Sequence, residues 1–167
     1  MNEDNRPDDT ENESEKFLYA IGDVYYAKVR FKDLEGNYRP QGAKWRPIVA
    51  LYDFNENEVA FYMITSTTTG YLSERFGCQI QDLESAGLTK PSMVRLGVGF
   101  RYGLDEPDPI GNRKGALSTK DMVRIIDAYE RISRQERIRT QEQIENAKSN
   151  DQQQDKLPKK DDFEQER

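Results

Sequence analysis

Residues 46–65 read RPIVALYDFNENEVAFYMIT, a stretch in which two apolar runs flank a polar one. The first run, 48–52, follows Pro47, and a proline is tolerated at the first position of a strand. The second run, 59–65, is rich in the β-branched and aromatic residues that favour strands. The polar residues 53–58 predict a turn. We therefore expect two consecutive β-strands joined by this turn.

One further strand is predicted on the N-terminal side, over residues 24–31. Its alternation places Tyr25 and Ala27 on one face and Lys28 on the other. Residues 32–44, which follow, contain two glycines and a proline and predict a long surface loop. Loops of that length are often functional.

The C-terminal side gives weaker signals for regular structure. Residues 80–86 suit either a short helix or a strand followed by a helical turn, and residues 92–98 predict another strand after Pro91. The two prolines in residues 105–115 predict a loop that leads into one more short strand.

The clearest helix signal spans residues 119–133. Ser118 with Asp121 three positions later resembles a capping box, and apolar residues then recur at helical spacing as far as Ile132. Residues 134–148 keep good helix formers but lose the apolar stripe, so the helix is expected to continue into solvent without burying a face.

Both ends of the chain are polar. Residues 1–16 carry seven carboxylates, and residues 134–167 contain few apolar side chains. We expect a disordered acidic arm and a polar tail, helical or disordered. Residues 17–133 between them predict one folded domain of the α+β class, a small β-barrel, closed or open, with a C-terminal amphipathic helix.

The composition excludes several function classes. The 167 residues hold 31 acidic and 25 basic side chains, one cysteine and no histidine. One cysteine excludes an intramolecular disulfide, and Cys78 is expected to be a small buried residue. The lack of histidine removes imidazole acid–base chemistry and the usual zinc sites. No apolar run suits a membrane span and the N-terminus is acidic, so a cytoplasmic protein without a membrane partner is expected.

The basic charge is concentrated around the predicted loop. Residues 28–46 have a net charge of +4, and Tyr38 and Trp45 lie among these charges. Cations beside aromatic rings suit single-stranded nucleic acid, because cations contact phosphates while rings stack on bases. A solvated hairpin is the plainer explanation of the same pattern.

Two residues next to the strands could carry chemistry. Arg46 lies where a loop enters a strand, and its planar fork matches a phosphate, although a structural salt bridge or an arginine stacked at the rim is an equal alternative. Thr65 ends the next strand but could be an ordinary strand threonine. The acidic loop with Asp105, Glu106 and Asp108 is best explained as solvated, so no metal site is predicted.

The order of several motifs resembles the MazF/PemK family, toxin endoribonucleases of type II toxin–antitoxin systems. The motifs are GDVY at 22–25, RPIV at 46–49, ITS at 64–66, KPSMVRL at 90–96 and GALS at 115–118, followed by the amphipathic helix. The resemblance covers residues 18–132. One departure is that several members have an acidic residue followed by glutamine where this chain has Ser92 and Met93.

The resemblance implies a small SH3-like barrel, usually a homodimer, that cuts single-stranded RNA without a metal or other cofactor and is inhibited by a cognate antitoxin with an acidic segment. The family's catalytic arginine and threonine fall on Arg46 and Thr65, and its structural signature on Gly22, Asp23 and Pro47. The residues expected to bind RNA are Lys28, Arg30, Lys32, Arg39, Lys44, Trp45, Ser66 and Thr67.

In such cleavage the 2′-hydroxyl of RNA attacks the adjacent phosphorus and leaves a 2′,3′-cyclic phosphate and a 5′-hydroxyl. Arg46 would neutralise the developing charge and Thr65 would donate a hydrogen bond to a phosphate oxygen. Two alternatives stay open, a non-catalytic module of this fold that binds RNA or an acidic peptide, and an adaptor that acts through the polar tail. The acidic arm, with a net charge of −5, could also fold over the basic loop and weaken RNA binding.

Overall fold

The computed structural model describes residues 19–107 and 109–154, so the predictions for the arm 1–16 and for residues 155–167 lie outside the described residues. The elements are β1 (Asp23–Val29), β2 (Lys44–Asp53), β3 (Glu58–Thr65), α1 (Tyr71–Phe76), β4 (Gly77–Ile80), β5 (Ser92–Arg95), the 3₁₀ turn η2 (Val98–Phe100), β6 (Arg101–Tyr102), β7 (Ile110–Ala116) and α2 (Thr119–Gln154). No helix in the described part of the chain has the length and apolar character needed to cross a membrane.

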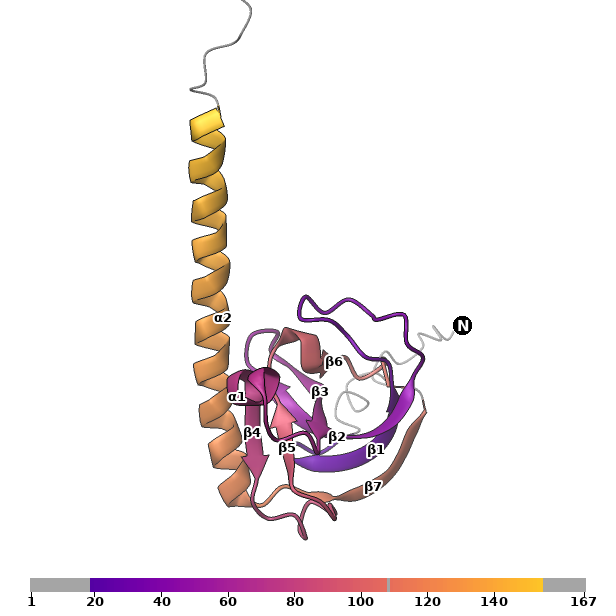
Figure 1. Cartoon of the computed structure of the whole chain (residues 1–167). Helices are drawn as coiled ribbons and strands as arrows, with labels where there is room; N and C mark the ends of the chain where they lie inside the picture. The colour runs from indigo at the N-terminus through magenta and orange to yellow at the C-terminus, as the bar shows by residue number, and fades with distance from the viewer. Residues whose placement is uncertain (1–18, 108, 155–167) are drawn as a thin grey trace, which may run out of the picture.

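The strands form one antiparallel sheet in the order β4-β5-β3-β2-β1-β7, with β6 pairing with β3 (Figure 1). This confirms the predicted α+β class. The sheet curves but stays open, since its end strands β4 and β7 do not pair along their length. Near this gap the amide of Ala116 donates a hydrogen bond of 2.9 Å to the carbonyl of Ser85, in the turn after β4.

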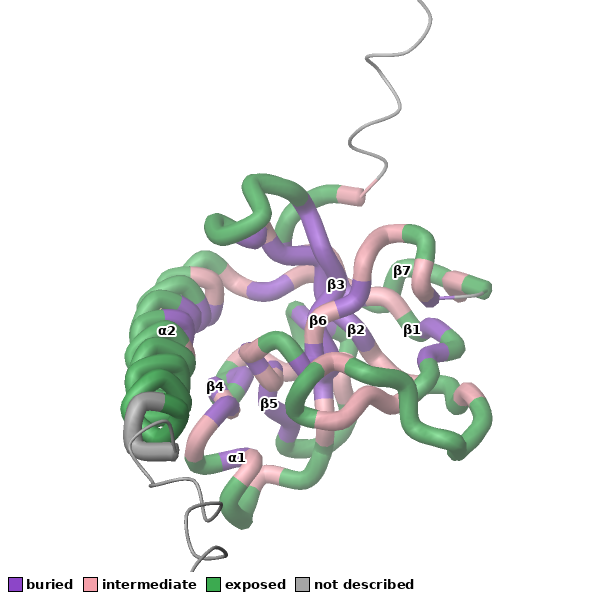
Figure 2. Tube along the Cα trace, turned by 90° about the horizontal axis from the view of Figure 1, so that it is seen from above, coloured by how far each residue is buried: buried purple, intermediate pink, exposed green. Residues whose placement is uncertain are grey.

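The β2–β3 hairpin is the centre of the core, as residues 46–65 predicted. Ile48 pairs with Met63, and the ladder runs without a break to the pair Asp53 and Glu58. The side chains from Val59 to Ile64 are all buried, and much of β3 is coloured as buried in Figure 2. Cys78 is also buried, as expected.

Three of the weaker predictions need correction. Residues 71–76 form the short helix α1, which the sequence analysis missed, and of residues 80–86 only Ile80 belongs to a strand. The strand predicted over 92–98 ends at Arg95, because Gly97 has a φ of 127° and turns the chain into η2. Residues 110–115 were predicted as loop but belong to β7, which pairs with β1 in an irregular register.

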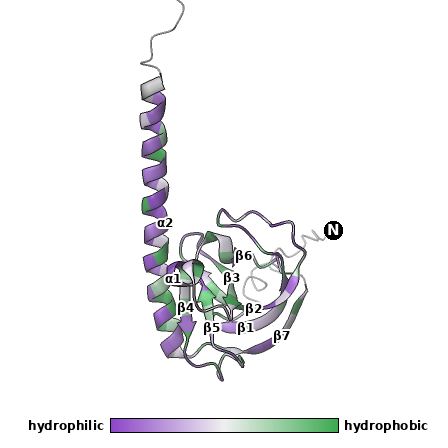
Figure 3. Ribbon diagram, viewed as in Figure 1, coloured by the Kyte–Doolittle hydropathy of each residue, from purple (hydrophilic) through white to green (hydrophobic). Residues whose placement is uncertain are grey.

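Helix α2 begins as predicted and continues well past the folded body. The amide of Asp121 donates a hydrogen bond of 3.2 Å to the Ser118 hydroxyl, which confirms the cap. Ile125, Tyr129 and Ile132 are buried against the sheet. Beyond Ser133 the helix extends away from the body, and most of its side chains are exposed and hydrophilic (Figures 1 and 3).

The close approach of β7 to the turn after β4 gives a test of the fold. A Cβ added at Gly115 would lie 2.3 Å from the carbonyl oxygen of Ser85, which is backbone and cannot swing aside. Gly115→Ala is therefore expected to lower the free energy of unfolding by about 1–3 kcal/mol. At Gly42 an added Cβ meets nothing within 4 Å, so Gly42→Ala should shift it by less than about 0.5 kcal/mol. Urea unfolding of both variants checks this, and equal effects would contradict the close approach.

Candidate functional site

Arg46 and Thr65 come together at one end of the central hairpin. Ile48 pairs with Met63, and continuing that register by two residues places Arg46 opposite Thr65. Opposed residues of an antiparallel pair point to the same face of the sheet. Both side chains accordingly line one cleft of about 220 Å³.

This cleft is lined by side chains of one charge. Its wall consists of Phe31, Lys32, Arg39, Arg46, Met63, Ile64, Thr65, Thr67, Leu72, Arg95, Gly99, Phe100 and Tyr102. Four of these residues are cationic, and none of the described residues that line the cleft is a carboxylate. Cations, hydroxyl groups and aromatic rings together suit an anionic ligand with attached bases, such as a nucleic-acid phosphate.

Two guanidinium groups face the cleft in matching surroundings. The guanidinium carbon of Arg46 lies 5.3 Å from the ring centre of Phe31, and that of Arg95 lies 5.5 Å from the ring centre of Phe100. The Nε atoms of Arg46 and Arg95 are buried and have no hydrogen-bond partner among the described residues. Burial lowers the pKa of Arg95 from its usual value. A buried donor without a partner is costly, so this pair indicates a site for an anion.

The hydroxyl cluster after β3 forms the second wall. The amide of Thr67 donates a hydrogen bond of 3.1 Å to Oγ1 of Thr65, and the Ser73 hydroxyl donates one of 2.7 Å to the Thr67 carbonyl. Nη2 of Arg95 also donates to the Ser73 oxygen, at 3.2 Å. Because Oγ1 of Thr65 accepts in this network, its own proton remains available to a ligand oxygen.

Lys32 differs from the other cations of the cleft because its charge is paired with Glu106. Its Nζ lies 2.7 Å from Oε1 of Glu106, and the Tyr38 hydroxyl donates to the same oxygen at 2.7 Å. Burial tends to raise the pKa of Glu106, but the hydrogen bonds from Lys32, Tyr38 and the Gly103 amide lower it overall. The hydrogen bond to Glu106 is the main cause that raises the pKa of Tyr38 to about 12. Glu106 therefore serves as a half-buried partner that holds Lys32 and Tyr38 in place.

The structure divides the predicted RNA-binding residues into two groups. Lys32, Arg39 and Thr67 line the cleft, together with Arg46 and Thr65. The cleft lining does not include Lys28, Arg30, Lys44, Trp45 or Ser66. The division has a simple cause for Trp45, because neighbouring residues of a strand point to opposite faces, and Trp45 precedes Arg46.

The three signature residues have structural contacts. The amide of Gly22 donates to the Ala50 carbonyl at 2.7 Å, and Gly22 has a φ of 93°. Asp23 forms an ion pair of 2.9 Å with Arg113. Pro47 pairs with Tyr26 in the β1–β2 ladder, inside β2 rather than at its first position. The strand begins earlier than predicted, at Lys44.

Arg95 was not among the site residues predicted from the sequence. The available signal was a single charged residue between Val94 and Leu96. Its meaning depends on the β3–β5 pairing, in which Thr65 lies opposite Met93, because that pairing brings β5 beside the cleft. No group of three acidic, cysteine or histidine residues in the described part of the chain could hold a metal ion.

Arg95 has no ion-pair partner among the described residues, which leads to a prediction in which stability and binding change in opposite directions. Arg95→Met keeps the volume but removes a half-buried charge, so the free energy of unfolding should stay unchanged or rise by about 1–2 kcal/mol. The affinity for an anionic ligand of the cleft, with single-stranded RNA as the probe, should fall at least tenfold, since a charge-assisted hydrogen bond is worth about 1.5–3 kcal/mol. Lys90→Met, at an exposed lysine outside the cleft lining, is the control. Thermal unfolding and RNA titration measure the two effects, and a loss of stability without loss of affinity would make Arg95 structural.

A scan of the sequence against protein-family models and a search of curated proteins both find no match, so the geometry of the cleft is what bears on function.

Proposed function

We propose that this chain is an endoribonuclease that cuts single-stranded RNA without a metal ion, as a toxin of a type II toxin–antitoxin system. The observation that carries the proposal is the convergence of Arg46 and Thr65 on one cleft lined by four cations and no described carboxylate. The two residues come from different strands, and the resemblance to the MazF/PemK family had singled out the same pair.

The proposed chemistry is an internal transesterification. The 2′-hydroxyl attacks the phosphorus, the 5′-oxygen leaves with a proton, and the products carry a 2′,3′-cyclic phosphate and a 5′-hydroxyl. Arg46 and Arg95 neutralise the charge that develops on the phosphoryl oxygens, and Thr65 donates a hydrogen bond to one of them. Lys32 and Arg39 hold the flanking phosphates, and Phe31 and Phe100 keep the two guanidinium groups in place.

The proposal extends to fold family and partners. The open sheet with α2 beside it would be a variant of the SH3-like barrel of the MazF/PemK family. A homodimer, a cytoplasmic location and a cognate antitoxin whose acidic segment occupies the cationic cleft would follow from the same family.

The test is to incubate the purified protein with a long single-stranded RNA in excess EDTA and to determine the chemistry of new ends. The proposal expects cyclic phosphate and 5′-hydroxyl ends, produced by the parent protein and not by Thr65→Ala. Thr65→Val, which keeps the β-branched shape without the hydroxyl, controls for packing in β3. Intact RNA with a folded parent protein would overturn the nuclease proposal.

A second candidate function is a non-catalytic module that binds RNA or an acidic peptide. It is favoured by the strand β5, which carries Ser92 and Met93 where several members of the family have an acidic residue followed by glutamine. RNA binding without cleavage, lost in Arg95→Met, would support it.

The third alternative, an adaptor that acts through the polar tail, is tested by a deletion whose position the structure decides. The Glu136 side chain packs beside Gly97 at the start of η2, where an added Cβ would lie 3.2 Å from its Oε1, so the deletion should begin after it. Removal of residues 140–167 would abolish partner binding by an adaptor but should leave a nuclease active.

A further inference from the structure

A pair of exposed aromatic rings lies on the sheet away from the cleft. Tyr26 on β1 and Trp45 on β2 are 40% and 43% exposed. Their rings are stacked, with centroids 5.6 Å apart and an angle of 17° between the planes. Large aromatic side chains with this much open surface are the usual platforms for the bases of single-stranded nucleic acid.

The platform is built into the sheet by the strand next to β1. A Cβ added at Gly111 of β7 would lie 2.3 Å from the Tyr26 carbonyl oxygen and 3.3 Å from Cζ3 of Trp45. Only glycine therefore lets β7 approach closely enough for its backbone to support the indole ring. The support makes the two rings a fixed surface, which reduces the entropy lost when a base stacks on them.

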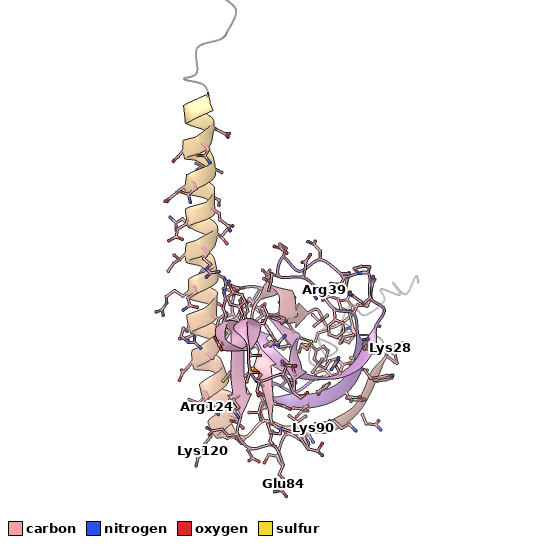
Figure 4. The ribbon with its side chains drawn as sticks, viewed as in Figure 1. Lys28, Arg39, Glu84, Lys90, Lys120 and Arg124 are labelled. Atoms are coloured by element: carbon pink, nitrogen blue, oxygen red, sulfur yellow. The ribbon has the colours of Figure 1, made fainter. Side chains whose placement is uncertain are left out.

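Two lysines flank the rings. Nζ of Lys114 lies 5.5 Å from the ring centre of Tyr26, and Lys28 is the cross-strand partner of Trp45. Neither lysine forms an ion pair with any residue of 19–107 or 109–154. Lys28 lies on the side of the sheet away from α2 (Figure 4). The rings and the two cations together have the composition of a site for a base and its neighbouring phosphates.

The platform and the cleft belong to opposite faces of one strand. Trp45 and Arg46 are consecutive in β2, so their side chains point to opposite sides while their Cα atoms are about 3.8 Å apart. A single strand of RNA that leaves the cleft around the start of β2 therefore reaches the platform within a few nucleotides.

We propose a second binding site for single-stranded nucleic acid, formed by Tyr26, Trp45, Lys28 and Lys114. This site holds the nucleotides that flank the RNA segment in the cleft. Binding at this platform is independent of cleavage. Its consequence for catalysis rests on the proposed function: the platform should raise the affinity for long substrates and leave short ones unaffected.

Trp45 is the only tryptophan in the chain, so intrinsic fluorescence reports on the platform directly. The probe is a 2′-O-methyl oligouridine of twelve nucleotides, which lacks the 2′-hydroxyl and is not cleaved by 2′ attack. The comparison probe is an abasic oligomer with the same number of phosphates. The proposal expects the uridine probe to quench the fluorescence and the abasic one to leave it nearly unchanged, since only bases stack.

The variants separate stacking from charge. Tyr26→Ala should weaken binding of the uridine probe about tenfold, whereas Phe54→Ala, at an aromatic residue that is 59% exposed in the turn after β2, should not change it. Lys28→Gln with Lys114→Gln should lower the slope of log affinity against log salt by about 1.4. Lys120→Gln, at the start of α2 and far from Lys28 in Figure 4, should leave the slope unchanged.

The outcomes distinguish this proposal from the proposed nuclease activity. Base-dependent quenching lost in Tyr26→Ala supports the platform even if the parent protein cuts no RNA. Active cleavage without quenching, or with equal affinity of parent and Tyr26→Ala for the uridine probe, overturns the platform and leaves the nuclease standing. The abasic oligomer or polyglutamate could instead bind as tightly as the uridine probe, with the same loss of affinity in the lysine variants. That result would show that the surface binds polyanions in general, and it would also overturn the platform.

Discussion

Arg46→Ala is expected to lower the rate of RNA cleavage by about 10²–10³-fold, the cost of removing one donor that stabilises developing charge in a transition state. The guanidinium faces the cleft with a buried Nε that has no partner among the described residues. Its removal therefore takes away the proposed contact with RNA and breaks no described hydrogen bond inside the protein. The folded state should stay intact, and the loss should appear in kcat rather than only in KM.

Two further variants show whether charge or shape is responsible. Arg46→Lys keeps the charge but loses the planar fork, so an intermediate rate is expected. Lys44→Ala is the matched control, because Lys44 lies two residues earlier on the same face of β2 but outside the cleft lining. It should change the rate by less than about threefold, as expected for an exposed charge. Single-turnover cleavage measures all three, and equal losses in Arg46→Ala and Lys44→Ala would reduce Arg46 to one charge among several.

The second large effect concerns stability and the buried carboxylate of Asp53. This side chain is only 2% exposed and lies at the end of β2. It accepts hydrogen bonds from the Tyr129 hydroxyl of α2, from Nε of Arg101 in β6, and from the amides of Asn55 and Glu56. One carboxylate thus connects the helix, the small strand β6 and the hairpin turn.

Asp53→Ala is expected to lower the free energy of unfolding by about 3 kcal/mol, because four donors lose their shared acceptor and the Arg101 charge loses its buried partner. Glu58→Ala is the matched control. Glu58 is the other partner of Arg101, but its side chain is 59% exposed, so the loss should stay below about 1 kcal/mol. Urea unfolding at neutral pH compares the two. Equal losses would mean that the ion pair with Arg101, and not the buried network, carries the effect.

The pH dependence of the same site has a definite sign. Burial alone raises the pKa of Asp53, but the hydrogen bonds from Tyr129, Asn55 and Arg101 outweigh burial and lower it below its usual value. The stability due to the ionised carboxylate is therefore fully present above the unfolded pKa of about 3.9 and is lost as the pH falls through the lower folded pKa. The difference in stability between the parent and Asp53→Asn should shrink in this acidic range.

The sequence determined the elements whose signals are local. The apolar runs of residues 46–65 predicted the central hairpin, and the Ser118 cap with the apolar stripe to Ile132 predicted where α2 begins and which side it buries. These patterns depend on spacing along the chain, which one sequence contains in full. Helix α1 was not predicted, and most of β7 was predicted as loop, because a six-residue helix and an irregular edge strand beside two prolines take their form from their neighbours.

The composition of the site depends on contacts between strands. Arg46 and Thr65 could be predicted as site residues from the sequence. Arg95 lies beside them only because β3 pairs with β5. Trp45 lies outside the cleft lining because alternate side chains of a strand point to opposite faces. Asp53 was predicted as a turn residue, but in the structure it accepts hydrogen bonds from Tyr129 and Arg101, which are distant along the chain. The residue types and their order are written in the sequence, whereas contacts between residues far apart along it depend on strand pairing and helix docking, which sequence periodicity does not specify.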